Sequence, residues 1–544
     1  MEKKQSFLEG ALLLSLGVLS VKVIGALYKV PLAAVISEEG MGYFGTAYSF
    51  YNVLFSVATA GLPVAVSRAV SAADAKSDFL RVEKIRRTAL PLFFLTGLFG
   101  FVFLVLFAPP FFRAVKNPGA VPALICLSPS VLFCGMSAAY RGYFEGRRNM
   151  VPTAVSQIIE AFLKLIVGLS AAIFVMRSSG VPEESKTALA AAAAISGVTV
   201  GSLLSFFYLW CKNKREEKAH RMRLVFGKDE KKRLSKQLLR AALPVSLGAV
   251  AVSVSGFIDA SFLQTRLLRI INTNPLPLFS MYAGCIPGTI LEKSESVPNY
   301  LFGCYNMALT LFMLVPSVTQ AFAISALPNV SAAVSRGDRN ALKRTVETVL
   351  RITLLFALPA GLGLSALADP VTKLIYGERL ASPVISAVLS VLGIAAVFSS
   401  VTMPLTSMLQ AAGKTVLPVL LTTIGLILKI ILNYILVGLP EINLLGGAIS
   451  TLISTAVTVL LLYRALCRVL CMKFRLRGIA VKPLFASLLC VLAAKSAQRW
   501  LHFLGVTGRL SVLPCIFAAV LFYAAALLAL GAVTKADIAT VKHR

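Results

Sequence analysis

The sequence predicts an all-α polytopic membrane protein with about fourteen transmembrane helices, arranged as two parallel-repeat six-helix lobes plus two C-terminal helices. Of its 544 residues, 57% are hydrophobic and 14% are charged, whereas soluble domains average about 45–50% and about 25%. The apolar residues form blocks of about 20, the length that a helix needs to cross the hydrocarbon core. Lys and Arg residues concentrate in alternate connections between these blocks, as they do in membrane proteins.

The predicted spans place both termini in the cytoplasm. With that orientation most of the 54 Lys and Arg residues lie on the cytoplasmic side, as the positive-inside rule requires of a multi-pass membrane protein. Omitting one span would put the later basic connections on the outer side of the membrane, so an even number of spans is favoured. In order, the predicted spans cover residues 10–36, 44–67, 88–108, 120–140, 152–175, 187–211, 240–264, 298–326, 346–367, 382–409, 415–437, 444–463, 482–501 and 510–533.

Three pairs of matching segments predict an internal duplication. Ser15–Tyr28 resembles Ser246–Asp259, and Gly61–Asp74 resembles Ala326–Asp338. Both copies begin on the cytoplasmic side, so the repeat is parallel, and such repeats are related by an axis along the membrane normal, with the substrate site at their interface. The third match pairs Gly146, Pro152 and Lys164 with Gly413, Pro418 and Lys429. The predicted domains are an N-lobe at residues 1–211, a basic connector at 212–239, a C-lobe at 240–468, and spans thirteen and fourteen with the C-terminal tail at 469–544.

The net charge of +30 does not predict nucleic-acid binding, because the basic residues are divided among the connections of a membrane protein. The longest basic segment, Lys212–Lys236, is expected to rest on anionic lipid headgroups. The nine cysteines are scattered and there are only three histidines, so neither a metal site nor a disulfide framework is predicted. We expect the protein to need no cofactor. Its expected partners are membrane lipids and a lipid-linked substrate, and we expect it to be a monomer.

Ionisable side chains inside predicted spans are the first candidates for a substrate site, since each is costly in hydrocarbon and usually faces a cavity. Lys22 and Lys29 on the first span are seven residues apart and project from one face. Together they can bind a single anionic group such as a pyrophosphate. The alternative is that they extend toward a membrane interface, which is more plausible for the shallower Lys29.

Other buried charges leave two interpretations open. Glu160 and Lys164 are spaced i, i+4, so they either face a cavity or neutralise each other within their helix. Asp259 is either a ligand for a coupling cation or a structural acid. Lys429, with Asn433 one turn later, is the repeat counterpart of Lys164.

Two polar stripes predict a water-filled cavity, because a lipid-facing surface has no use for them. They lie on the second helix of each half. Span two carries Ser49, Asn52, Ser56 and Thr59, and span eight carries Asn306, Thr310, Ser317 and Gln320.

Two segments carry a family resemblance: KVIGALYKVPLAAVISEEGMGYFGTAYSFYNVLFSVATAGLPVAVSR and YRGYFEGRRNMVPTAVSQIIEAFLKLIV. With them the whole chain resembles the stage V sporulation protein B group and is similar to the lipid II flippases of the MurJ type. These belong to the multidrug/oligosaccharidyl-lipid/polysaccharide (MOP) exporter superfamily. The resemblance implies a two-lobed molecule that works by alternating access. It also implies movement of an undecaprenyl-pyrophosphate-linked sugar from the inner to the outer leaflet.

The resemblance extends to single residues. MurJ-type proteins have a basic residue, then V-x-G, then a second basic residue one turn on, and Lys22, Gly25 and Lys29 match this loosely. A sodium site of some relatives uses acids on spans seven and eleven. Asp259 matches the first of these, but span eleven offers only Asn433.

We therefore expect a flippase, not an enzyme, for a polyprenyl-pyrophosphate-linked glycan precursor such as lipid II or a related wall or spore-cortex intermediate. The alternatives are a cation-coupled multidrug exporter of the same fold and an exporter of another lipid-linked polysaccharide unit. A membrane glycosyltransferase or phosphatase is disfavoured, because the outer acidic residues are scattered over several loops. The glycan, the coupling to sodium, protons or membrane potential, and a vegetative or sporulation role all stay open. The candidate substrate-binding residues are Lys22, Lys29, Ser49, Asn52, Ser56, Glu160, Lys164, Asn306, Thr310 and Lys429; the coupling-ion candidates are Asp259 and Asn433.

Overall fold

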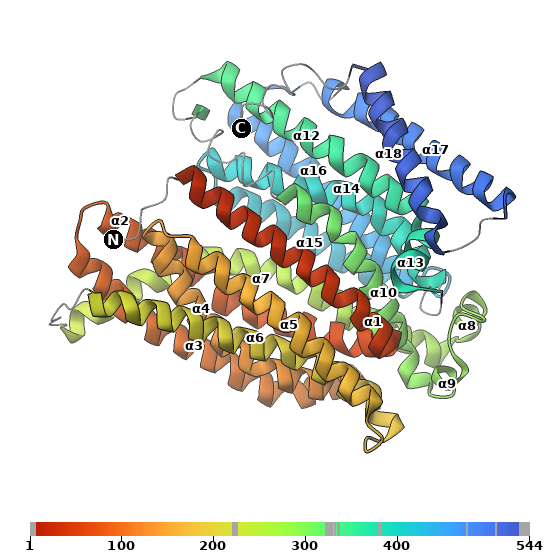
Figure 1. Cartoon of the computed structure of the whole chain (residues 1–544), viewed down its shortest axis with the longest axis horizontal. Coiled ribbons are helices and arrows are strands. Elements are labelled where there is room, and N and C mark those ends of the chain that lie inside the picture. The colour runs from red at the N-terminus through yellow and green to blue at the C-terminus, as the bar shows by residue number, and fades with distance from the viewer. Residues whose placement is uncertain are drawn as a thin grey trace. The chain divides into compact units, whose positions relative to one another are not determined.

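The protein is helical throughout the part of the chain that the structure, a computed structural model, describes: residues 7–219, 227–320, 330, 333–334, 338–378, 383–474, 477–505 and 509–531 (Figure 1). In those ranges, thirteen helices are long and apolar enough to cross a membrane. The first of them, Ser20–Asp74, covers predicted spans one and two. The predicted class, an all-α polytopic membrane protein, is confirmed.

The elements follow one another with short connections. In the first half they are α1 (Phe7–Thr59), α2 (Gly61–Asp74), α3 (Phe79–Ala114), η1 (Pro118–Ala120), α4 (Val121–Gly146), α5 (Val151–Arg177), α6 (Glu183–Ala219) and α7 (Lys228–Thr273). Then come α8 (Leu276–Met281), α9 (Gly288–Leu291), η2 (Ser294–Ser296), α10 (Val297–Phe312), α12 (Arg339–Ala366), α13 (Ala368–Tyr376), α14 (Pro383–Ala411), α15 (Val416–Leu436), α16 (Leu444–Leu470), η3 (Arg477–Val481), α17 (Lys482–Phe503), η4 (Arg509–Ser511) and α18 (Val512–Ala529).

Helix α1 contains two membrane crossings. At 53 residues a straight helix would be about 80 Å long, more than twice the roughly 30 Å of hydrocarbon. The chain turns at Ser37, whose φ of 60° and ψ of −177° are not helical. The predicted loop over residues 37–43 is therefore wrong, because helix resumes directly after Ser37. The predicted second span also differs, since α1 ends at Thr59 and α2 begins at Gly61.

Several helices are longer than predicted. Helix α4 continues to Gly146, and α6 and α7 extend into the predicted basic connector. Residues 220–226 of that connector, and most of the repeat segment Ala326–Asp338, lie outside the described residues. Hydropathy marks the apolar centre of a helix but not its polar ends, so helix ends are where the prediction falls short.

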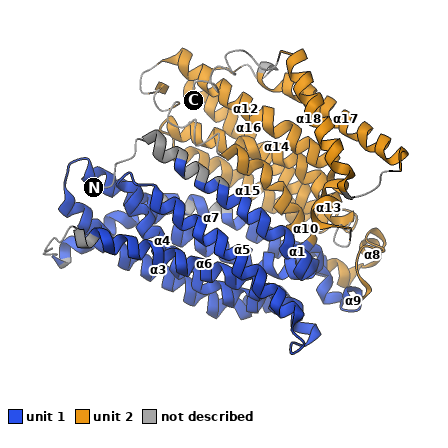
Figure 2. Cartoon of the chain, in the orientation of Figure 1, with its two compact units in different colours: residues 1–268, 289–303 blue, residues 269–288, 304–544 orange. Residues whose placement is uncertain are grey.

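The chain divides into two compact units (Figure 2). Unit 1 comprises residues 1–268 and 289–303, and unit 2 comprises residues 269–288 and 304–544. Most of α7 is thus in unit 1, although the duplication makes this helix the first of the second half. The predicted domain boundaries follow sequence repeats rather than contacts, and they stay a prediction.

Contacts along α7 explain why it is part of unit 1. A Cβ atom on Gly61 would lie 2.2 Å from the carbonyl oxygen of Ala242, so α2 and α7 touch backbone to backbone. Further along, the hydroxyl groups of Ser56 and Ser253 are hydrogen-bonded. The rings of Phe50 and Phe257 follow, with centroids 5.6 Å apart.

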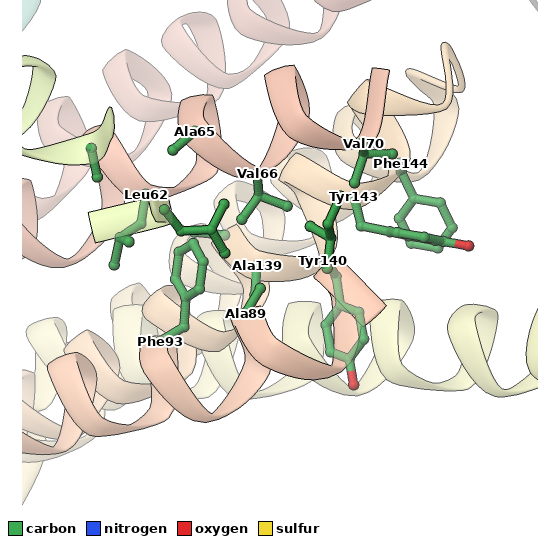
Figure 3. Packing of buried hydrophobic residues seen from close by; sticks show 14 of the residues in the cluster. Leu62, Ala65, Val66, Val70, Ala89, Phe93, Ala139, Tyr140, Tyr143 and Phe144 are labelled. Carbon is green, nitrogen blue, oxygen red and sulfur yellow. The ribbon is translucent and has the colours of Figure 1, made fainter. Parts of the chain in front are cut away.

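One apolar cluster of unit 1 lies around α2 (Figure 3). This helix packs its apolar face against α3 and α4, and residues of α6 and α7 complete the cluster. Between membrane helices this packing is chiefly van der Waals contact. The buried members include Leu62, Val66, Val70, Phe93, Ala139, Tyr140, Phe144, Leu209 and Leu238.

In unit 2 the main apolar cluster joins α12, α14 and α16. Its buried residues include Val346 and Leu350 of α12, Leu405 of α14, and Leu462 and Leu466 of α16. Helix α15 packs beside α16, and α17, which is paired with α18, packs beside α12.

The predicted topology can be tested by labelling single cysteines with an impermeant thiol reagent. In a variant lacking the nine native cysteines, Gly180→Cys should react from outside intact cells, whereas Lys76→Cys and Lys414→Cys should react only after the membrane is opened. All three positions are exposed turns, so lack of reaction reports the side of the membrane and not burial. Labelling of Lys414→Cys from outside would contradict the predicted orientation.

Candidate functional site

Helix α5 supplies the centre of the candidate site in unit 1. Ser156, Glu160, Lys164 and Gly168 follow one another every four residues and therefore share one face. Gly168 and Gly197 bring α5 and α6 into close contact, because a Cβ atom on Gly197 would lie 2.5 Å from the backbone nitrogen of Gly168. Small residues at such crossings let membrane helices approach closely. The backbone bearing Lys164 is thus held firmly against α6.

The ammonium group of Lys164 lies between two aromatic rings of α1. Its Nζ atom is 4.8 Å from the ring centroid of Tyr48 and 5.2 Å from that of Tyr28. It also donates a hydrogen bond of 3.3 Å to the Tyr48 hydroxyl. Cations at these distances are attracted by the ring face. Tyr28 is fully buried and donates its own hydroxyl hydrogen to the Ala194 carbonyl at 2.8 Å, so this side of the contact is rigid.

Glu160 forms its ion pair with Arg141 of α4. The Nη2 atom of Arg141 is 3.0 Å from Oε2 of Glu160. The same guanidinium donates to the hydroxyls of Ser156 at 2.9 Å and Ser205 at 3.0 Å. Among the described residues Lys164 has no ion pair. The i, i+4 spacing of Glu160 and Lys164 allowed the two side chains to neutralise each other. In the structure they do not, because Glu160 pairs with Arg141.

The lysines of the first span lie in the same region. Lys29 is half-buried and within electrostatic reach of both Lys164 and Lys22. Lys22 is exposed. The structure thus places Lys29 within electrostatic reach of two other lysines, Lys22 on its own helix and Lys164 on α5.

The polar stripe of span two is divided between two environments. Ser49 and Asn52 are half-buried. Ser56 instead faces α7, where it meets Ser253, and it donates to the Asn52 carbonyl at 2.7 Å. Ser56 therefore contributes to helix packing in this structure.

The candidates in unit 2 are buried within that unit. Asn306 and Thr310 are buried, and Thr310 donates to the Asn306 carbonyl at 3.0 Å. Lys429 is 8% exposed. Asn433 is fully buried and accepts a hydrogen bond of 2.6 Å from Ser450 of α16.

The coupling-ion candidates belong to different units. Asp259, which is 3% exposed, lies in unit 1, and Asn433 lies in unit 2. Their assignment stays a prediction. Within the described ranges, no group of three or more His, Cys, Asp or Glu side chains is arranged to hold a metal ion.

Sequence reasoning missed the partners of these residues. Predicted span four ends at residue 140, just before Arg141, whereas α4 continues to Gly146. Tyr28 and Tyr48 were not considered as ligands. The signal for Tyr48 was present, since Phe44, Tyr48, Tyr51 and Phe55 form a continuous row of aromatic rings at helical spacing.

A second polar group, which we call the amide cluster, was also missed. Asn117, in the turn before η1, donates to Oε1 of Gln264 on α7 at 2.9 Å and to Oδ1 of Asn299 on α10 at 3.0 Å. Gln264 in turn donates to Thr46 of α1 at 2.6 Å. All four side chains are buried, and all four belong to unit 1. They come from four distant parts of the sequence, so no local pattern could have predicted the cluster.

Unit 2 contains an apolar cavity of about 440 Å³. It is formed by α12, α13, α17 and α18. Apolar side chains such as Leu355, Pro359, Val491 and Val520 line it, together with Tyr523. The Tyr523 hydroxyl donates to the Leu355 carbonyl at 2.7 Å, which joins the last helix to α12.

Comparisons with known proteins identify the family. The profile of the family described as "Polysaccharide biosynthesis protein" matches residues 7–328. The chain belongs to this family. A second profile, MatE, matches residues 302–435.

Individual relatives of the family cover most of the chain. It is 24% identical over 462 residues to "Lipid II flippase MurJ" of Bacillus subtilis, covering 82% of this chain and 79% of that one. It is 24% identical over 545 residues to "Stage V sporulation protein B" of the same organism, covering 98% and 97%. The solved structure "Lipid II flippase MurJ, inward closed conformation" matches with a TM-score of 0.67 and 18% identity, covering 95% and 98%. The predicted superfamily is confirmed, and the fold is that of a MurJ-type transporter.

The close contact of α5 with α6 predicts a strong effect of a larger side chain at Gly197. Gly197→Val would drive its Cβ into the Gly168 backbone, so we expect a loss of about 1–3 kcal/mol in stability. Thermal unfolding of the purified protein in detergent measures this. Gly180→Val is the matched control, since a Cβ atom there meets nothing closer than 4.0 Å. Equal unfolding temperatures for both variants would show that α5 and α6 are not held as described.

Proposed function

We propose that this protein is a flippase that moves a polyprenyl-pyrophosphate-linked glycan precursor from the cytoplasmic to the outer face of the membrane by alternating access. One observation carries the proposal. Lys164 presents an ammonium group within a membrane span, steadied by Tyr28 and Tyr48 and without an acidic partner among the described residues. An ionisable group in that setting generally serves a substrate or an ion.

The chemistry of a pyrophosphate suits this setting. It brings at least two negative charges into a region of low dielectric constant, where an unpaired charge is very costly. Fixed ammonium groups compensate that cost, and Lys29 lies within electrostatic reach of both Lys164 and Lys22. Lysine binds phosphate as a point charge on a flexible stem. Such a contact allows the anion to leave as well as to enter.

The membrane potential favours the proposed direction. When a negative charge moves outward across a membrane with a negative interior, its free energy falls by about 2.3 kcal/mol per charge per 100 mV. An anionic headgroup can therefore drive its own export. Coupling to a cation through Asp259 and Asn433 is the second possibility that we propose to test.

Other parts of the substrate have candidate contacts in each unit. We assign the glycan to the polar side chains Ser49 and Asn52 of unit 1 and Asn306 and Thr310 of unit 2. Lys429 is the repeat counterpart of Lys164 and provides a second buried cation. The apolar cavity beside α17 and α18 suits part of a polyprenyl chain. Moving such a substrate requires no bond to be broken, so we propose a transporter and not an enzyme.

The two named relatives guide the choice of substrate. One is a lipid II flippase and the other a sporulation protein. We propose lipid II or a related wall or spore-cortex intermediate on this basis, for a protein of the bacterial cytoplasmic membrane.

A multidrug exporter is the second candidate, favoured by the MatE match at residues 302–435. Cation-coupled exporters of cationic drugs need an acidic cavity. Lys29, with Lys164 and Lys22 within its electrostatic reach, disfavours a cationic substrate in unit 1.

The test of the proposed function is a vesicle assay with a defined polyprenyl-pyrophosphate-linked sugar. Lys164→Ala should lower the rate of flipping at least tenfold, because one tenfold step corresponds to about 1.4 kcal/mol of lost binding to the pyrophosphate. Lys22→Ala should also lower it, and Lys164→Arg should keep part of the activity because the charge survives.

Lys495→Ala is the control, since Lys495 is exposed on α17 of unit 2 and its loss should leave flipping unchanged. All variants must accumulate in the membrane to the same level. Normal flipping by Lys164→Ala would show that the anion binds elsewhere. Export of a cationic dye in place of the lipid would favour the multidrug exporter.

A further inference from the structure

The spacing of Glu160 and Lys164 on α5 poses a problem for an anion site. Side chains at i and i+4 on a helix are neighbours, and a glutamate there readily pairs with the following lysine. A paired Lys164 would offer a pyrophosphate little net charge. An anion site built on Lys164 therefore requires that something keep Glu160 away from it.

Arg141 holds Glu160 away from Lys164. Its Nη2 atom binds Oε2 of Glu160 at 3.0 Å. The other carboxylate oxygen, Oε1, is 3.7 Å from the Sγ atom of Cys134, which can donate a weak hydrogen bond. Both oxygens of Glu160 are thus directed toward α4.

The guanidinium group is itself fixed from two sides. Its Nε atom donates to Ser156, one turn before Glu160 on α5, and Nη2 donates to Ser205 of α6. The side chains of Arg141 and Glu160 are 16% and 24% exposed, so both are largely withdrawn from solvent. A lysine at position 141 would have the charge but not the planar set of donors for these three partners.

Removing Arg141 would leave a partly buried carboxylate without its cation, which is strongly unfavourable. The nearest compensation is Lys164, one helical turn along the same face. Rotation of Glu160 toward Lys164 would satisfy both groups. The ammonium group of Lys164 would then be paired with Glu160 and no longer available to bind an incoming anion.

We propose that Arg141 is a positioning residue: by holding Glu160 on α4, it keeps the charge of Lys164 available to the pyrophosphate group of the substrate. This inference rests on the proposed function for the identity of the anion. It assigns to Glu160 a role different from substrate binding, since the carboxylate pairs with Arg141, which also donates to Ser156 and Ser205.

The inference predicts a rescue. We would titrate inorganic pyrophosphate into the purified full-length protein in detergent and measure its affinity for wild type, Arg141→Gln, Glu160→Gln and the double variant. Arg141→Gln should bind about tenfold or more weakly, as expected when one charge-assisted contact is lost. The double variant should return to within about threefold of wild type, because the competing carboxylate is gone. Glu160→Gln alone should bind as tightly as wild type or more tightly.

Arg147→Gln is the matched control. Arg147 forms an ion pair of 3.1 Å with Glu216, with side chains 26% and 24% exposed, in the same unit. Loss of that pair should leave pyrophosphate affinity unchanged. A purely structural role for Arg141 predicts that the double variant is as weak as Arg141→Gln, and that result would overturn the proposal.

The remaining outcomes are also decisive. Should Arg141→Gln fail to fold, Glu160→Gln alone still tests the inference, because weaker pyrophosphate binding by that variant would show that the carboxylate assists the anion and would contradict it. Wild-type affinity in Lys164→Gln would instead show that the proposed anion site is wrong. Failure of the inference and failure of the proposed function are thereby distinguished.

Discussion

A charge inside a membrane must have a partner, and the candidate site depends on how this protein meets that requirement. One carboxylate and one guanidinium on adjacent helices pair with each other, and two serine hydroxyls accept further hydrogen bonds from the same guanidinium. The neighbouring ammonium is satisfied by aromatic rings instead. Rings attract a cation without cancelling its charge. A cation held in this way is stable in the resting protein and still attractive to an anion.

The surrounding helices make that arrangement rigid. The glycine contact between α5 and α6 fixes the backbone that bears Lys164. The tyrosines belong to the two halves of α1, which reverse direction at Ser37. Because Tyr28 precedes the turn and Tyr48 follows it, both crossings of α1 contribute to one site. A turn of several flexible residues would hold the two rings less firmly relative to each other.

The sequence alone predicts the membrane-spanning helices well, because each needs a long apolar stretch that soluble segments lack. It also identifies Lys164 as unusual, since a lysine in such a stretch is costly. It could not predict that Glu160 pairs with Arg141, because that choice depends on how α4 packs beside α5. The sequence predicts a reversal between residues 36 and 44, but not that it is confined to Ser37, because a serine with positive φ leaves no composition signal of the kind that glycine or proline gives. The place of α7 in unit 1 likewise follows from contacts such as Gly61 with Ala242, which repeats in the sequence do not reveal.

The amide cluster of Thr46, Asn117, Gln264 and Asn299 differs from the site in one physical respect, which is that none of its members carries a net charge. An electric field across the membrane pulls on ions in proportion to their charge, but it exerts no net force on a neutral amide. The resting membrane potential therefore exerts a force on the charged lysines of α1 and α5. It exerts no net force on the neutral amide cluster, which links α1, α7 and α10. Because the side chains of the amide cluster do not ionise, changes of pH or salt concentration have no direct effect on the cluster. Unit 1 thus contains charged side chains on which the membrane potential acts and, sharing α1 with them, a cluster of neutral side chains on which it exerts no net force.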